Sequence, residues 1–407
     1  MDKTVTRRRD FLGAAAVAAG AAKALAYPAS ETVNIGCIGT GGRCRALMRS
    51  LSGVPGTRIA AVCDIWDDAL AQAREIAGPG AFATKDYHEL LGRGDVDAVL
   101  IGSPDHWHVP MTVDACNAGK DVYVEKPLTH DLDEGDAVIR AQNDSKRIVQ
   151  VGTQQRSMPQ FARAREILQS GKLGTIHKVH MTWNRNRTAP RPRSYDIDPS
   201  ELDWSQFLGN APRQPFDPYR FRNWRWFWDF GGGILTDLMV HWIDAVNWLL
   251  DLPDPAMATT IGDTFAMDRW EAPDTIQTLL RYPEKEVQVY FEGTFVNQRN
   301  KAMIEIMGTK GTMYLDRGRC EIHPEPESGL ATEDFSPGTG ERGADFDVDG
   351  GTLHLQNWID AVRGRERPNT PAEEGVRACV SAHLANLAFR TGQVARLASL
   401  ERGGMAG

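Results

Sequence analysis

Apolar runs and helical patterns alternate along the first third of the chain. Short runs rich in β-branched and other apolar residues predict buried strands at 33–38, 58–63, 96–102, 121–125 and 147–152. Helical patterns lie between them, the first ending at Leu51 and two others covering 109–118 and 133–143. This alternation is typical of right-handed βαβ units, so we expect a parallel sheet covered by helices.

The pattern changes beyond residue 156. A helix at 162–170 and a strand at 176–184 precede a long Pro- and Arg-rich stretch, 185–219, that we expect to be irregular and functional. Further strands are predicted at 255–265, 274–282, 286–294, 301–308 and 311–316. An acidic, Gly-rich loop at 324–347 and helices at 353–362 and 375–390 complete the pattern. We therefore expect two α/β domains, 33–155 and 156–400.

A Gly-rich turn follows the first strand and opens a helix. Its residues are Gly39, Thr40, Gly41, Gly42, Arg43 and Cys44, where Cys44 takes the third position of the G-x-G-x-x-G pattern. Backbone N–H groups of such a turn bind a pyrophosphate at the helix N-terminus. Asp64, 25 residues after Gly39, ends the second strand, where an acid binds the ribose hydroxyls and repels a 2′-phosphate. The pattern predicts a Rossmann domain that binds NAD rather than NADP.

Three polar clusters follow the later strands of this sheet, at 103–108, 125–127 and 152–156. Ligands of parallel sheets bind at the carboxyl ends of strands. The cofactor contacts that we expect from these clusters are Ser103, His106, His108, Glu125 and Gln154. Lys126 ends a buried strand before Pro127, where it could accept a hydroxyl proton close to a nicotinamide. The alternative for Lys126 is a surface position in a turn.

The segment from Gly231 to Leu250 is apolar nearly all round, which predicts a buried helix. Its charged or His positions are Asp237, His241 and Asp244, spaced i, i+4, i+7 on one stripe. A polar stripe on a buried helix should line a cavity or meet buried partners. An Asp–His pair satisfied within the core and a metal site remain alternatives. No third metal ligand is evident, so we expect no metal.

Aromatic and Arg residues gather beside this helix. Seven of the eleven tryptophans lie between Trp183 and Trp248, and the run 222–228 reads RNWRWFW. Flat rings suit the C–H faces of sugars, and Arg donates to hydroxyls, so the density favours a carbohydrate. The substrate contacts that we expect are Arg156, Trp183, Arg225, Trp226 and Asp237. Individual rings could instead belong to the core.

Composition agrees with a soluble globular protein. The 407 residues are 42% hydrophobic and 25% charged, and the net charge of −8 argues against nucleic acid as a partner. The six cysteines form no C-x-x-C pair and are too sparse for a disulfide scaffold.

The N-terminus resembles a twin-arginine export signal. The sequence TRRRDFLG is followed by an Ala-rich run, 13–22, too short to span a bilayer, and by the small-x-small site Ala24-Leu25-Ala26. We expect residues 1–26 to be a signal that directs export to the periplasm or another extracytoplasmic space. The resemblance implies export after folding, which suits a protein that takes up its cofactor first.

The series GTGGR, SPDHWH, EKP, GTQQRS and GGGILTDLMVHWID resembles the Gfo/Idh/MocA family of NAD(P)-dependent oxidoreductases. The resemblance implies a Rossmann domain, an α/β domain with a large open mixed sheet, and homo-oligomers built through the outer sheet face. It also implies sugar or polyol substrates, a Lys126–Pro127 bond that is often cis, and catalytic roles for Asp237 and His241. His241 would accept or relay a proton, and Asp237 would orient the substrate or His241.

Three functions fit this pattern. The first is an oxidoreductase acting on a sugar, glycoside or polyol with tightly bound NAD. The second is an NAD-dependent glycoside hydrolase that oxidises its substrate transiently, eliminates the aglycone, adds water and reduces again. The segment Ile234–Asp237 lacks the Tyr–Pro–Thr–His of such hydrolases, which favours the first. The third is a non-catalytic sugar sensor, which the combination of Lys126, Asp237 and His241 disfavours.

Overall fold

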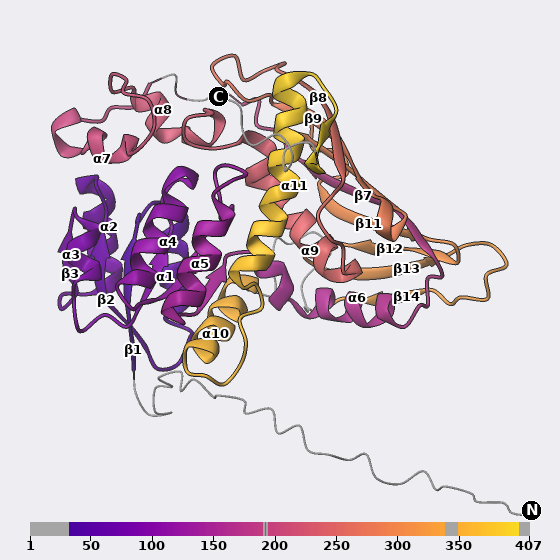
Figure 1. Cartoon of the computed structure of the whole chain (residues 1–407), viewed down its shortest axis with the longest axis horizontal. Coiled ribbons are helices and arrows are strands. Elements are labelled where there is room, and N and C mark those ends of the chain that lie inside the picture. The colour runs from indigo at the N-terminus through magenta and orange to yellow at the C-terminus, as the bar shows by residue number, and fades with distance from the viewer. Residues whose placement is uncertain (1–31, 190–191, 193, 338–348, 399–407) are drawn as a thin grey trace, which may run out of the picture.

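Residues 32–189, 192, 194–337 and 349–398 are described by a computed structural model, which has two sheets (Figure 1). The proposed signal, 1–26, lies outside these residues. No helix in the described ranges is both long enough and apolar enough to cross a membrane.

The first sheet has six parallel strands in the order β3-β2-β1-β4-β5-β6. The strands are β1 Val33–Ile38, β2 Thr57–Cys63, β3 Phe82–Thr84, β4 Ala98–Ile101, β5 Asp121–Val124 and β6 Val149–Val151. The helices between them are α1 Gly42–Leu51, α2 Asp67–Ala77, α3 Tyr87–Leu91, α4 His108–Asn117 and α5 Gly135–Ser145. The expected Rossmann arrangement is confirmed, although α2, β3 and α3 carry patterns too short or too polar to be predicted.

The second sheet has nine strands in the order β14-β13-β12-β11-β7-β10-β9-β8-β15. Its strands are β7 Ile176–Asn184, β8 Met257–Asp263, β9 Thr275–Tyr282, β10 Val287–Thr294, β11 Ala302–Gly308, β12 Gly311–Leu315, β13 Cys320–Pro324, β14 Glu333–Phe335 and β15 Ala395–Arg396. Only β7 and β10 pair in parallel, so the sheet is mixed as expected. The short strand β14 lies within the segment that we expected to be a loop. Its three residues carry no periodic apolar pattern, and its place in the sheet depends on pairing with β13.

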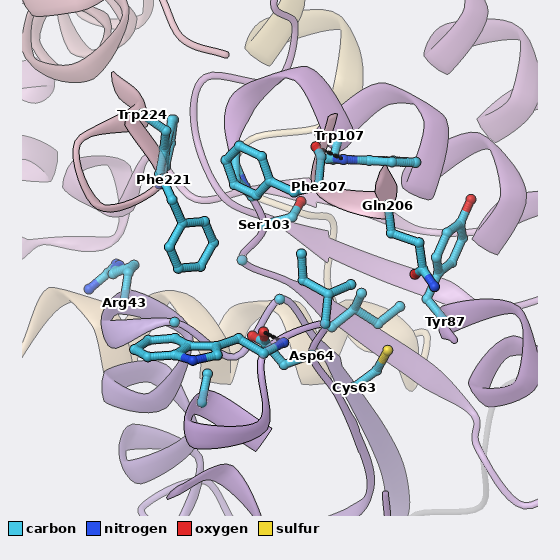
Figure 2. Close-up of a pocket in the computed structure, with 18 of the residues that line it drawn as sticks. Arg43, Cys63, Asp64, Tyr87, Ser103, Trp107, Gln206, Phe207, Phe221 and Trp224 are labelled. Atoms are coloured by element: carbon cyan, nitrogen blue, oxygen red, sulfur yellow. Dashed lines mark hydrogen bonds between the residues drawn. The ribbon is translucent and has the colours of Figure 1, made fainter. Parts of the chain in front are cut away.

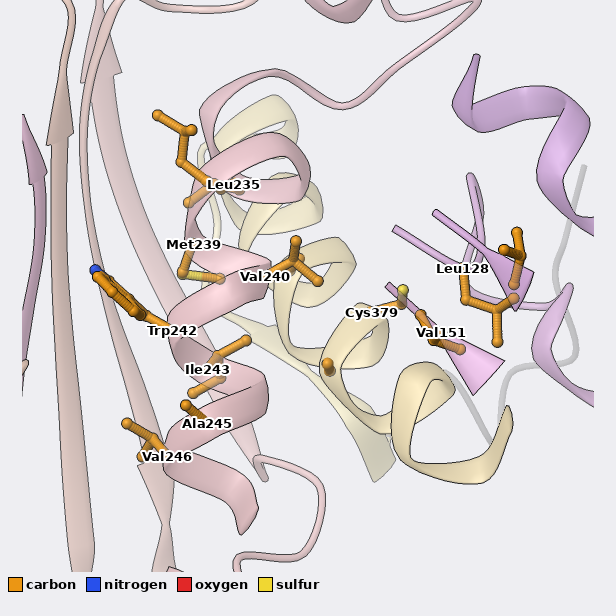
Figure 3. Close-up of a cluster of buried hydrophobic side chains, with 14 of the residues drawn as sticks. Leu128, Val151, Leu235, Met239, Val240, Trp242, Ile243, Ala245, Val246 and Cys379 are labelled. Atoms are coloured by element: carbon orange, nitrogen blue, oxygen red, sulfur yellow. The ribbon is translucent and has the colours of Figure 1, made fainter. Parts of the chain in front are cut away.

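The apolar helix predicted after Gly231 is buried between the second sheet and the long helix α11, Ala372–Thr391 (Figure 3). It begins with one wide π-helical turn, Leu235–Met239, and continues as α9, Val240–Leu250. Trp242 points to the sheet and donates from its indole nitrogen to the Thr182 carbonyl at 2.8 Å. Helix α6, Pro159–Gln169, packs against α9 as well.

Helix α10, Gly350–Val362, returns to the first domain although it belongs to the second half of the chain. Its Leu355, Trp358 and Ile359 share one hydrophobic core with Val33 and Ile35 of β1. The first domain therefore includes a helix that lies, along the chain, far beyond the boundary predicted near residue 156.

Residues 194–225, here called the excursion, include most of the Pro- and Arg-rich stretch after β7 and cross to the first domain. The excursion includes two short helices, α7 Trp204–Leu208 and α8 Pro218–Arg222. Figure 1 shows both helices above the first domain, facing α2 and α4. This excursion covers the edge of the parallel sheet where the Gly-rich turn lies.

Candidate active site

The Gly-rich turn leaves space where a phosphate would bind. Gly39 has a φ of +70°, and a Cβ there would lie 2.5 Å from the Ser103 nitrogen, so only glycine fits. At Gly41 and Gly42 a Cβ would meet nothing within 4 Å. Because α1 begins at Gly42, the free N–H groups of its first turn face this open space.

Cys44 replaces the third glycine of the motif without separating helix and strand. A Cβ on Gly102, at the end of β4, would lie 2.7 Å from the Cys44 Cβ. The close approach is therefore made by a glycine on the strand side, which compensates for the departure from the motif. All six cysteines are buried and free.

Asp64 is held in place at the end of β2. Its carboxylate accepts from the Trp66 backbone N–H at 3.0 Å and from the Thr40 hydroxyl at 3.2 Å. Burial raises the pKa of Asp64 to about 6, so the group is mostly ionised at neutral pH. Thr40 is fully buried, so its side chain fixes Asp64 rather than reaching a ligand.

A pocket of about 340 Å³ lies between the Gly-rich turn and the excursion (Figure 2). The first domain contributes Gly41, Asp64 and Ser103, and the second contributes Phe207, Phe221, Arg222, Trp224 and Arg225. The Ser103 hydroxyl and the Trp66 indole nitrogen are buried, and the described residues offer them no hydrogen-bond partner. Free backbone donors, a ribose-binding acid and unsatisfied polar atoms fit a dinucleotide.

Arg43 and Glu125 form a pair at the far end of this pocket. The Arg43 Nε donates to Glu125 at 2.7 Å, and the second Glu125 oxygen accepts from the Lys126 backbone N–H at 3.2 Å. Burial alone would raise the pKa of Glu125, but Arg43 and Lys126 outweigh it and lower the pKa. Glu125 thus orients Arg43 and the Lys126 loop rather than lining the pocket.

Two histidines expected to touch the cofactor are bound to backbone. The His106 Nε2 lies 2.8 Å from the Phe207 carbonyl oxygen, and the His108 ring lies between the carbonyls of Pro127 (2.6 Å) and Ser103 (2.9 Å). Burial lowers both pKa values to about 4. A neutral ring carries a single N–H, so His108 donates to only one of these two carbonyls. His108 therefore lies between the ends of β4 and β5 rather than in the pocket, which argues against its assignment to cofactor binding. The His106 Nδ1 is buried with no partner among the described residues, so His106 stays a candidate contact.

Gln154 begins a short 3₁₀ turn after β6 and is outside the residues that line the pocket. Its side-chain oxygen is buried and has no partner among the described residues, so it stays a candidate contact.

Lys126, Asp237 and Arg225 form the charged centre of the site. The Lys126 Nζ donates to the Asp237 carboxylate at 3.0 Å and to the Asp237 backbone oxygen at 2.9 Å. The Arg225 Nε donates to the same carboxylate oxygen at 3.1 Å, and Arg225 also lines the pocket. The two cations lower the pKa of Asp237 against the effect of burial. The Lys126–Pro127 peptide is cis, as expected.

His241 is buried beside this centre, with 7% of its surface exposed. Its ring lies 5.3 Å from the Trp183 ring, at 30°. Burial and then the charges of Lys126 and Arg317 lower its pKa well below the ordinary value. The imidazole is therefore neutral at neutral pH, and its lowered pKa makes it a weaker base than a free histidine.

Asp237 does not share its partners with Asp244, contrary to the single stripe that we expected. Asp237 lies in the π-helical turn, whose wider winding breaks the i, i+4, i+7 geometry of an α-helix. Asp244 binds Arg156 at 2.8 and 2.9 Å, and Arg156 also binds Glu374 at 3.1 Å. This corrects the assignment of Arg156 to substrate: its side chain is 3% exposed and occupied by an ion pair.

Two tryptophans expected to contact substrate belong to the core. Trp226 stacks on Trp270 with ring centres 4.1 Å apart and is almost fully buried. Trp183 is buried between His241, Trp242 and the guanidinium of Arg317. Neither ring presents a free face to a sugar. The Trp183 ring instead packs against the His241 ring. Of the expected substrate contacts, Arg225 and Asp237 remain.

One acid of the site, within the SPDHWH cluster, was not predicted from the sequence. Asp105 is buried within electrostatic range of Lys126, Arg225 and Asp237. Burial raises its pKa to about 7. Its place at the end of β4 was the available signal, because each strand end of the sheet faces the same site. Within the described ranges, no three His, Cys, Asp or Glu side chains gather as a metal site would require.

Comparisons with known proteins agree with this geometry. Residues 33–153 match the model of an oxidoreductase family with an NAD-binding Rossmann fold, and residues 161–314 match the GFO/IDH/MocA C-terminal domain. Inositol 2-dehydrogenase 3 of Saccharopolyspora erythraea is 29% identical over 382 residues, covering 92% of this chain and 98% of that protein. A glycosyl hydrolase family 109 protein of Solibacter usitatus is 37% identical over 156 residues, covering 33% of this chain and 35% of that protein.

A similar fold occurs in the solved structure of levoglucosan dehydrogenase in complex with NADH and levoglucosan. Its TM-score is 0.73 at 17% sequence identity, and the match covers 90% of this chain and all of that one.

Proposed function

This chain belongs to the Gfo/Idh/MocA family of NAD(P)-dependent oxidoreductases, and we propose that it oxidises a hydroxyl of a sugar, glycoside or polyol with NAD. One observation carries the proposal: Arg225 lines the dinucleotide pocket and also binds Asp237, which holds the Lys126 ammonium. The charged centre and the pocket are thus adjacent parts of one site.

The residues of this centre divide the work of alcohol oxidation. When bound, the dinucleotide supplies a hydride acceptor. Two N–H groups of Lys126 donate to Asp237, which leaves a third to donate to the substrate oxygen and stabilise developing negative charge. This pairing favours charge stabilisation by Lys126 over the proton-accepting role that its place at the strand end suggested. Neutral His241 accepts the hydroxyl proton. Asp237 orients Lys126 and Arg225, whereas the family resemblance implied that it orients the substrate or His241.

Sugar or polyol substrates are supported by the relatives rather than by an aromatic platform. An inositol dehydrogenase matches nearly the whole chain, whereas the family 109 hydrolase matches only a third of it. This difference favours net oxidation over hydrolysis.

A panel of sugars, polyols and aryl glycosides tests the function. A dehydrogenase changes the absorbance of its nicotinamide near 340 nm with these substrates. A hydrolase releases aglycone without net redox change, and a sensor gives neither signal. If no substrate of the panel causes a redox change while the dinucleotide is bound, the proposed function is contradicted.

Asp64→Ala should narrow or reverse the preference for NAD over NADP. The substitution removes the acid that repels a 2′-phosphate, and it leaves Arg45 and Arg222 lining the same pocket. Arg43 is held by Glu125 at 2.7 Å, which keeps it from this end. Binding titrations with both dinucleotides measure the ratio. Wild-type protein that copurifies with NADP and not NAD would contradict the assignment of Asp64.

Export by the twin-arginine route is part of the proposal, and it demands a retained cofactor. Outside the cytoplasm we expect no useful pool of free NAD. Retention over hours requires a Kd of about 1 nM or tighter at ordinary association rates. We therefore expect purified protein to keep near-stoichiometric dinucleotide through dialysis and to turn over without added NAD, the cofactor being reset in place by a second sugar or by re-reduction. Dependence on micromolar or higher added NAD would contradict this.

A homo-oligomer assembled through the outer face of the second sheet completes the proposal. Ile261 of β8 and Leu279 of β9 lie on that face with 72% and 49% of their surfaces exposed. A second copy covering β8 and β9 would remove both from water.

A further inference from the structure

The excursion is fastened to the first domain by backbone contacts at one edge of the pocket. Leu202 pairs with Trp66 as an isolated antiparallel bridge, and the Asp203 N–H donates to the Ile65 carbonyl at 3.1 Å. The Lys85 Nζ donates to the Glu201 carbonyl at 3.2 Å. Ile65 and Trp66 directly follow Asp64, and Lys85 follows the neighbouring strand β3, so these contacts lie at the end of the pocket where an adenosine ribose would bind.

A second set of contacts fastens it above β4. The Trp107 indole N–H donates to the Phe207 carbonyl at 2.9 Å, and the His106 Nε2 lies 2.8 Å from the same oxygen. A Cβ on Gly209 would lie 2.7 Å from the Trp107 ring, so the excursion packs directly on this tryptophan. The Phe207 side chain then lines the pocket from above, as Figure 2 shows.

The side chains of α8 complete a cover over Trp66. The Phe221 ring meets the Trp66 ring edge-on at 5.6 Å, and the Arg222 guanidinium lies 5.3 Å from the centre of the same ring. All three residues line the pocket. Flat aromatic and guanidinium groups beside an unsatisfied indole N–H suit a purine base, which offers both a π-face and ring acceptors.

The other end of the excursion is anchored in the second domain. The Arg220 guanidinium binds Asp229 at 2.8 Å and Glu271 at 2.6 Å. The Trp228 N–H also donates to Glu271 at 3.0 Å. The pocket is therefore closed by a segment that is held by both domains.

We propose that residues 199–225, here called the clasp, form the adenosine half of the dinucleotide site and must detach from the first domain before the dinucleotide can leave. The adenine lies in the pocket beside Trp66, Phe221 and Arg222, and the Asp64 carboxylate binds the ribose next to it. The inference rests on the proposed use of a dinucleotide, and it explains how that cofactor is retained.

Release of NADH tests the clasp without reference to catalysis. Protein loaded with NADH is mixed with excess NAD, and the decay of bound-NADH fluorescence gives the release rate. Trp107→Phe removes the indole donor to Phe207, so release should become about tenfold faster, as for loss of one hydrogen bond made only in the closed state. Trp204→Phe is the matched control, because the Trp204 indole donates to Gln214 within the excursion. Its release rate should stay near that of the wild type.

A second pair of variants guards against misfolding. Arg222 is an exposed residue, so Arg222→Ala leaves the core intact. The substitution removes the guanidinium that covers the Trp66 ring and leaves Phe221 in place. Arg213→Ala is the control, because Arg213 is exposed and its guanidinium donates to Ser205 within the excursion. We expect NADH release from Arg222→Ala to be several-fold faster than from Arg213→Ala. Wild-type release rates in both Trp107→Phe and Arg222→Ala, or equal acceleration in the controls, would overturn the clasp.

The two proposals fail in different ways. If the protein binds NADH and shows these release rates but oxidises no sugar, the clasp is supported and the proposed dehydrogenase activity is contradicted. A protein that oxidises sugars while both variants release NADH at the wild-type rate keeps the dehydrogenase and loses the clasp.

Discussion

Lys126→Ala and His241→Ala should each lower turnover by about two to four powers of ten. This is the range for loss of an acid–base group such as His241, and it is close to the range for loss of a donor to a developing oxyanion, the role proposed for Lys126. In the proposed mechanism, Lys126 provides the ammonium that stabilises negative charge on the substrate oxygen, and His241 is the neutral ring that receives the proton. Neither residue lines the dinucleotide pocket, so the bound dinucleotide content should stay nearly unchanged. Single-turnover absorbance changes and extraction of bound dinucleotide measure both quantities.

His177→Ala and Lys178→Ala are matched controls, since both residues are exposed neighbours on β7. They should keep wild-type turnover. If either active-site variant also retained it, that residue would have no part in the mechanism. If dinucleotide content fell in proportion to turnover, Lys126 or His241 would belong to cofactor binding instead.

Arg156→Ala should destabilise the protein by about 3–5 kcal/mol, because it leaves a buried carboxylate without its partner. The Asp244 side chain has no exposed surface, and Arg156 is its ion-pair partner in the described part of the chain. Asp244→Asn should cost less, since Arg156 keeps Glu374 at 3.1 Å. Thermal or denaturant unfolding followed by two probes measures the loss and shows whether the domains unfold together.

A surface pair provides the control for this prediction. The Arg163 and Glu166 side chains are 42% and 67% exposed, and the second pair of Arg163, with Glu333 at 3.6 Å, is also partly exposed. Arg163→Ala should therefore change stability by less than about 1 kcal/mol. Folded Arg156→Ala protein should keep the substrate KM of the wild type. A large rise in KM without loss of stability would restore Arg156 to the substrate site.

Local patterns determined most of the fold. The parallel sheet, the Gly-rich turn, Asp64 at the end of β2 and Lys126 at the end of β5 each depend on a few consecutive residues, whose periodicity and turn chemistry are readable in the chain. The buried helix after Gly231 was equally clear, because a segment apolar on every side has no stable place but the interior.

The partners of the charged side chains were decided by the tertiary structure alone. Asp237 meets a lysine 111 positions earlier, and Asp244 meets an arginine 88 positions earlier. A helical stripe predicts which residues share a face, and the π-helical turn at Asp237 broke even that rule. The same residue types therefore form the proposed catalytic centre at one end of the helix and a buried ion pair at the other.

By itself, the sequence determined a dinucleotide-binding domain, a mixed-sheet domain and the chemistry available at the strand ends, because these follow from local propensity and spacing. Only the tertiary structure decided that Trp183 and Trp226 are core, that His106 and His108 bind backbone, and that residues 199–225 close the pocket from the other domain. Burial and partner choice depend on which distant segments pack together, and the local pattern of a chain carries no record of that packing.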